Sequence, residues 1–80
     1  MAVVEIFKTN VEDRTQARDL VRKIHRKFAA YSANFDLEDC DKILRVKSAT
    51  GPVQPVPLIR FLQELGTRAE VLEENVSPGR

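Results

Sequence analysis

The chain has 80 residues, of which 42% are hydrophobic and 31% charged, and its formal net charge is +1 at pH 7. A chain of this length forms one domain with a small core, and its balanced charge provides no general attraction to nucleic acid or to an anionic membrane. Cys40 is the one cysteine, which excludes a disulfide framework and fits a reducing, cytoplasmic compartment. The first ten residues lack the features of a signal peptide, and no apolar run approaches the ~20 residues of a membrane span.

Residues 3–7 (VVEIF) predict the first strand, because they are β-branched or aromatic apart from one glutamate. Successive side chains of a strand point to opposite faces. Val4 and Ile6 form a wholly apolar set and are expected to face the core. The mixed set is expected to face outward, and its members are Val3, Glu5 and Phe7.

Residues 13–28 predict an amphipathic helix, since their apolar side chains recur at helical spacing along one face. This stripe consists of Ala17, Leu20, Val21, Ile24 and Phe28. Asp13 is the expected N-cap with Gln16 three residues on, and Asn10 is an alternative start. Arg26 and Lys27 are favourable at the negative end of such a helix.

Residues 32–37 and 42–47 predict two further strands, because apolar and polar side chains alternate in both. The turn between them is too short for a crossover, so the two strands are expected to pair antiparallel. The inward-facing set is Ala33, Phe35, Leu37, Leu44 and Val46. The outward-facing set of the second of these strands is Ile43, Arg45 and Lys47.

The last third of the chain begins with a loop over residues 48–56, which contains one glycine and two prolines. Pro57 is expected to begin a second helix and Gly66 to end it. Residues 67–72 predict the last strand, with Ala69 and Val71 facing inward. The domain is therefore expected to span residues 1–72, followed by a flexible tail over 73–80.

The predicted order is β-α-β-β-α-β, which is the pattern of an α+β, ferredoxin-like fold. Such a fold has a four-stranded antiparallel sheet with both helices on one face. The other face is expected to be an interaction face that binds an unknown protein partner or forms a weak homodimer. Its predicted residues are Val3, Glu5, Phe7, Ile43, Arg45 and Leu72.

This element order, together with the closing segment QELGTRAEVL, resembles the heavy-metal-associated (HMA) domains of copper chaperones and metal-transporting ATPases. The chemistry of that family depends on Met-x-Cys-x-x-Cys in the loop before the first helix, where two thiolates bind Cu(I) or Zn(II). In this chain Val11 corresponds to the methionine, and Asp13 and Gln16 to the two cysteines. Neither of the latter is a soft ligand, so the resemblance implies the scaffold without its metal site.

The acidic turn over residues 36–41 is the densest polar cluster in the sequence. It lacks the glycine and the bidentate glutamate of an EF-hand loop, so a solvated turn is the simpler interpretation. Weak metal candidates are Asp39, Cys40 and Asp41, and the loop over residues 9–16 is the other place for an ion or small ligand. Cys40 is expected to be a partly buried packing thiol, because neighbouring carboxylates disfavour a reactive thiolate.

The remaining polar groups do not form a catalytic pattern. No nucleophile–base pair, carboxylate dyad or glycine-rich phosphate loop is found, so no catalytic residue and no cofactor is predicted. His25 is interpreted as a residue on the flank of the helix, and the basic run over 22–27 as a solvated surface. RNA-recognition motifs share the element order, but the aromatic residues on which bases stack are missing. We therefore expect a non-catalytic interaction domain, with metal or small-ligand binding as the alternative.

Overall fold

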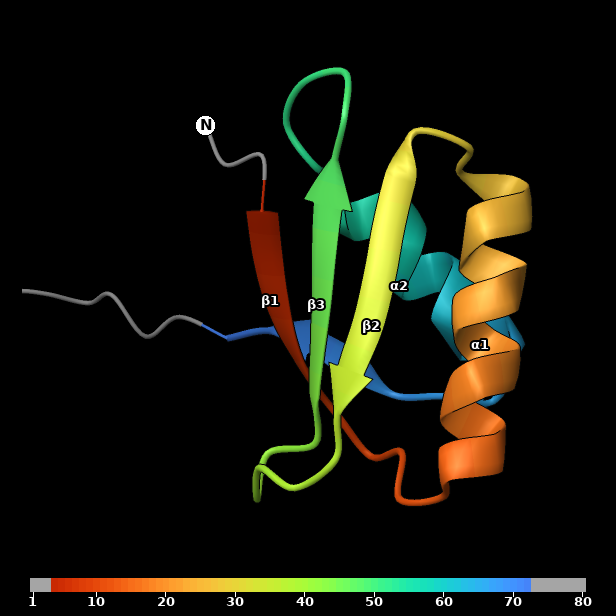
Figure 1. Ribbon diagram of the computed structural model, residues 1–80, viewed down its shortest axis with the longest axis vertical. Helices are drawn as coiled ribbons and strands as arrows, with labels where there is room; N and C mark the ends of the chain where they lie inside the picture. The colour runs from red at the N-terminus through yellow and green to blue at the C-terminus, as the bar shows by residue number, and fades with distance from the viewer. Residues whose placement is uncertain (1–3, 73–80) are drawn as a thin grey trace, which may run out of the picture.

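The structure is a computed structural model that describes residues 4–72 (Figure 1). The predicted tail and the first predicted strand residue, Val3, lie outside the described residues. The elements follow one another as β-α-β-β-α-β. Their bounds are β1 Val4–Thr9, α1 Arg14–Lys27, β2 Tyr31–Asp36, β3 Ile43–Ser48, α2 Pro55–Glu64 and β4 Ala69–Val71.

The fold is α+β, with a four-stranded sheet in the order β2-β3-β1-β4. All three neighbouring pairs are antiparallel, as predicted for β2 and β3. In this order β1 and β3 are the central strands, while β2 and β4 form the two edges. Figure 1 shows α1 running beside β2 and α2 crossing behind the sheet.

The core lies between the helices and one face of the sheet. From α1 it receives Leu20 and Ile24, and from α2 Leu58 and Leu62, all of which are at most 3% exposed. The core residues of the sheet are Phe7, Ala33, Leu44, Val46 and Ala69. Because residues from both helices belong to one cluster with these strand residues, the two helices cover the same face, and no other element of residues 4–72 covers the opposite face, which we call the open face.

The predicted facing of β1 is wrong. Phe7 is 0% exposed and lies in the core, whereas Ile6 is only half-buried. The reason is the register between β1 and β3, in which Phe7 is directly opposite Leu44. Directly opposed residues of an antiparallel pair share a face. Leu44 faces the helices, so Phe7 does as well, and Glu5 follows it by strand alternation.

The start of α1 agrees with its predicted cap. Asp13 has an extended backbone, and its carboxylate accepts a hydrogen bond from the Thr15 N–H at 3.1 Å. That bond satisfies one of the N–H groups that a first helical turn leaves without a partner in the helix. Phe28 follows the last helical residue as the C-cap, and the last turn contains Arg26 and Lys27.

The second helix begins two residues earlier than predicted, at Pro55. Pro55 and Pro57 both lie in its first turn, where a proline removes no helical hydrogen bond. Gly66 follows the helix with φ of +83°, a left-handed conformation that favours glycine and ends the helix as predicted. No helix within residues 4–72 has the length and apolar content that crossing a membrane requires.

Candidate interaction surfaces

The open face of the sheet carries an apolar patch centred on β1. Phe7 points into the core, so strand alternation directs its neighbour Ile6 to the opposite face. Val4, two residues before Ile6, lies on that same open face. Leu72 is the neighbour of Ile6 on the other side, because its N–H donates to the Ile6 carbonyl at 2.9 Å. Ile43 is diagonal to Ile6, since Ile6 is opposite Arg45. We call Val4, Ile6, Ile43 and Leu72 the sheet-face patch.

Basic side chains border this patch. In the register of β1 and β3, Lys8 is opposite Ile43, and Val4 is opposite Lys47. Arg45 lies in the row of Ile6, and its guanidinium donates to the Asn34 side-chain oxygen at 3.4 Å. The apolar side chains of the patch are therefore bordered by three basic residues. Asp36, opposite Ile43 on β2, and Glu70, opposite Lys8 on β4, add negative charge at the two edge strands.

Three of the six predicted interaction residues belong to the open face: Ile43, Arg45 and Leu72. Phe7 and Glu5 lie on the opposite face, and Val3 is not described by the structure. Ile43 is only 5% exposed although it lies outside the main core, so it is a buried member of the patch rather than a protruding contact. Val4 and Ile6 were not predicted for this face, and the signal for them was that large apolar residues occur in both alternating sets of β1.

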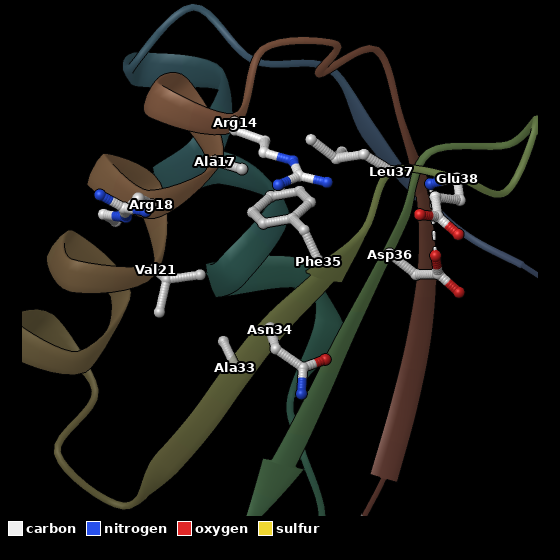
Figure 2. A pocket seen from close by; sticks show the side chains of 10 residues that line it. All are labelled: Arg14, Ala17, Arg18, Val21, Ala33, Asn34, Phe35, Asp36, Leu37 and Glu38. Carbon is white, nitrogen blue, oxygen red and sulfur yellow. Dashed lines mark hydrogen bonds between the residues drawn. The ribbon is translucent and has the colours of Figure 1, made fainter.

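A concave surface, separate from the sheet-face patch, lies between α1 and the edge strand β2 (Figure 2). This groove has a volume of about 400 Å³. Its apolar side chains are Ala17 and Val21 of α1, Ala33 and Phe35 of β2, and Leu37 after the strand. Arg14 and Arg18 stand on the helix side, and Asn34, Asp36 and Glu38 on the strand side. Figure 2 shows the Phe35 ring directed from β2 toward α1, with Arg14 reaching over it from the helix.

His25 holds the edge of β2 next to this groove. Its Nε2 accepts a hydrogen bond at 3.0 Å from the backbone N–H of Ala33. An edge strand leaves alternate N–H groups without a partner strand, and the imidazole occupies one of them. His25 therefore lies on the flank of the helix as expected, and it also has a specific structural role at the strand edge, which no sequence motif indicated.

The loop between β1 and α1 is one of the two places where an ion or small ligand was considered from the sequence. Its polar atoms are used within the fold: Thr9 Oγ1 donates to the Lys42 carbonyl at 2.6 Å and accepts from the Val11 N–H at 3.2 Å. Asn10 Oδ1 accepts from the Arg68 N–H at 3.1 Å. Val11 is 0% exposed and packs in the core. These contacts give the loop a structural role.

The acidic turn contains the one group of at least three His, Cys, Asp or Glu side chains in residues 4–72 that could hold a metal ion. It consists of Asp39, Cys40 and Asp41, whose donor atoms lie within 4.8 Å of one another. The Asp39 carboxylate accepts from the Asp41 N–H at 2.9 Å, a contact that shapes the turn itself. Cys40 is exposed, so the expectation of a partly buried thiol is wrong. The turn projects beyond the sheet and offers the sulfur no core to pack against.

The chain was also compared with known proteins. It matches no family model, no curated protein and no solved structure.

Proposed function

We propose that this protein is a non-catalytic interaction domain that binds another protein on the open face of a ferredoxin-like sheet. The fold part of the proposal is supported by the β-α-β-β-α-β order and by the central position of β1 and β3. From the resemblance to HMA domains we further propose that the β1–α1 loop keeps the scaffold of that family but lacks its two metal-binding thiolates. Thr9, Asn10 and Val11 support this view, because all three hold the loop to the fold.

The observation that carries the functional part is the sheet-face patch. A single-layer sheet face exposed to water is normally polar, whereas here Val4, Ile6 and Leu72 are adjacent and only half-buried. Contiguous apolar surface bordered by charged groups is typical of protein contact sites. Lys8, Arg45 and Lys47 border the patch, so a partner surface with an apolar centre and acidic periphery complements it.

The partner is either a different protein or a second copy of this chain. A two-fold dimer buries the same patch from both copies and is the commonest closed assembly. It would also bring the basic borders of both copies together, which limits its affinity. A weak homodimer or a complex with a foreign acidic partner is therefore the expected outcome.

Ile6→Glu tests this proposal, because the substitution places a charge at the centre of the patch. Ile6 lies opposite Arg45, so the new carboxylate has a cross-strand cation and folding is expected to survive. Ser32→Glu is the matched control: it adds the same charge on the same face, but on edge strand β2 next to Lys47. Thermal melts of both variants verify that they are folded.

Sedimentation equilibrium from ~1 to ~100 μM shows whether the chain associates with itself. If it is monomeric, crosslinking in an extract of the parent cell tests for a different protein partner. We expect either self-association or a defined set of crosslinked partners. Ile6→Glu should lower the association constant or the crosslinking yield at least tenfold, and Ser32→Glu should leave it unchanged. Equal association of the wild type and Ile6→Glu would contradict the proposed face. A monomer with no crosslinked partner would contradict the interaction function altogether.

Metal binding is the second candidate function, and the convergence of Asp39, Cys40 and Asp41 is the observation that favours it. A thiolate with two carboxylates suits a borderline ion such as Zn(II) better than Ca²⁺. Titration calorimetry with Zn(II), Cu(I) and Ca²⁺ tests it, with Cys40→Ser as the variant. A dissociation constant below ~1 μM that Cys40→Ser weakens supports this candidate, and a weaker or unaffected one rejects it.

A further inference from the structure

We propose that the groove between α1 and β2 binds an extended, acidic segment of a partner protein, which adds to the sheet as a strand at the β2 edge. This site is distinct from the sheet-face patch and uses a different part of the sheet. Three features of the described residues carry the proposal: open backbone groups on β2, an apolar groove beside them, and arginines on the wall of the helix.

The direction of the β2 backbone groups follows from two hydrogen bonds. The N–H of Tyr31 donates to the Phe28 carbonyl at 3.0 Å, and that of Ala33 to His25 Nε2 at 3.0 Å. Both therefore point away from β3, and strand alternation directs the N–H of Phe35 the same way. Within residues 4–72 no group accepts a hydrogen bond from the Phe35 N–H. The edge is thus occupied at one end and open at Phe35.

The groove lies directly beside this open position. Phe35 and Leu37 are half-buried and, with Val21 across from them, provide apolar surface that a partner side chain can cover. An added strand would place a residue opposite Phe35, and directly opposed residues share a face. That partner residue and its neighbours two positions away would therefore project into the groove, while the intervening side chains would lie on the open face.

The charges of the groove specify the chemistry of the bound segment. Arg14 and Arg18 are exposed on the helix wall, and neither forms an ion pair in the part of the chain that the structure describes. Arg14 is the first helical residue, where the positive end of the helix dipole disfavours a cation, and the first turn contains no acidic residue. A carboxylate on a groove-facing position of the segment would neutralise this wall. Asp36 and Glu38 lie on the strand side, so carboxylates of the segment are expected only at positions next to the helix wall, and its open-face positions are expected to be neutral or basic.

These features define the bound state. The segment runs antiparallel to β2, and its residue opposite Phe35 exchanges two backbone hydrogen bonds with Phe35. The segment covers the edge from Leu37 to Asn34, at about 3.3 Å per residue, and ends before Ala33, whose N–H donates to His25. Groove-facing positions alternate along the segment and are apolar or acidic. Main-chain hydrogen bonds then provide affinity, and the groove provides specificity, as in other cases of strand addition.

The test uses the full chain and a phage library of random nine-residue peptides. The peptide with the highest enrichment is synthesised and titrated by calorimetry and by amide chemical shifts. We expect a dissociation constant below ~1 mM, apolar and acidic residues at alternate positions, and shift changes confined to residues 14–21 and 33–38. No binder of this strength, or shift changes on the sheet-face patch instead, would overturn the proposal.

Two matched comparisons test the binding mode. Methylation of the peptide amide that bonds to Phe35 is expected to weaken binding at least tenfold, whereas methylation of the next amide, which points away from β2, should leave it within threefold. Arg18→Glu is expected to weaken binding at least fivefold, and Arg26→Glu, with the same change in charge on the same helix, less than twofold. Equal effects within either pair would overturn strand addition or the role of the arginines, respectively.

Two further measurements separate this proposal from the other surface. Ile6→Glu should leave peptide affinity unchanged, because Ile6 lies in the sheet-face patch, so the two proposals can fail independently. If sedimentation shows instead that the wild-type chain self-associates and that Arg18→Glu abolishes this, the occupant is a second copy, and the proposal of a foreign acidic segment is wrong.

Discussion

Phe7→Ala is expected to be the most destabilising truncation in β1, and Ile6→Ala a mild one. Phe7 is fully buried between Leu44 and Val71 on the helix-facing side of the sheet. Removal of a buried phenylalanine side chain costs about 3–5 kcal/mol, because apolar burial is lost and a cavity remains. Ile6 is only half-buried on the open face, so its truncation is expected to cost about 1 kcal/mol.

The size of the effect decides the assay. A chain of this length has a free energy of unfolding of about 4–12 kcal/mol, so Phe7→Ala removes a large part of it. With a urea dependence of about 1 kcal/mol per M, its midpoint falls by about 3–5 M, and the variant can unfold without denaturant. Phe7→Leu keeps most of the apolar volume and is expected to cost about 1–2 kcal/mol, which keeps the comparison measurable.

Urea melts followed by circular dichroism give all three free energies. The order of destabilisation should be Phe7→Ala, then Phe7→Leu, with Ile6→Ala comparable to or below the latter. If Ile6→Ala costs as much as Phe7→Ala, then β1 has the opposite facing. The register of Phe7 with Leu44, and with it the sheet-face patch, would then be wrong.

Three other predictions concern the core and the single thiol. Leu20→Ala should cost about 2–5 kcal/mol in a urea melt, because Leu20 is 3% exposed in the stripe of α1, and a loss below ~1 kcal/mol would contradict its burial. Thr67→Val should be neutral or stabilising by about 1 kcal/mol in the same assay, since the buried Thr67 Oγ1 has no hydrogen-bond partner among the described residues; a clear loss of stability would show that the hydroxyl is used. Native Cys40 should react with a thiol reagent as fast as in the urea-unfolded chain, because it is exposed, and a much slower native reaction would show that it is protected.

The two surfaces place different demands on a partner. The sheet-face patch presents side chains only, because the backbone groups of the central strands are used in the sheet. The groove presents backbone groups of the edge strand as well as side chains, so it favours an extended segment over a folded surface. Together, the two proposals predict that the domain binds either two partners at once or one partner that contacts both the face and the edge.

Local patterns in the sequence were enough for most of the fold. The stripe of Leu20 and Ile24 predicts the buried face of α1 because helical periodicity is set by the backbone alone. The Asp13 cap and the stop at Gly66 also depend on local geometry. In β3, Leu44 and Val46 alternate with Arg45 and Lys47, so period two assigns their face.

Tertiary structure alone decided the facing of β1, the exposure of Cys40 and the role of His25. Both alternating sets of β1 contain large apolar residues, so composition does not decide its facing, and only its register with β3 directs Phe7 inward. Cys40 is exposed because it lies on the turn that joins β2 and β3, outside the packed elements, a matter of shape that composition does not encode. His25 meets Ala33 only because the chain reverses after α1, which brings a helix side chain to a strand edge eight residues later. Such contacts join residues through the packing of elements, so their positions follow from the assembled sheet rather than from any local pattern.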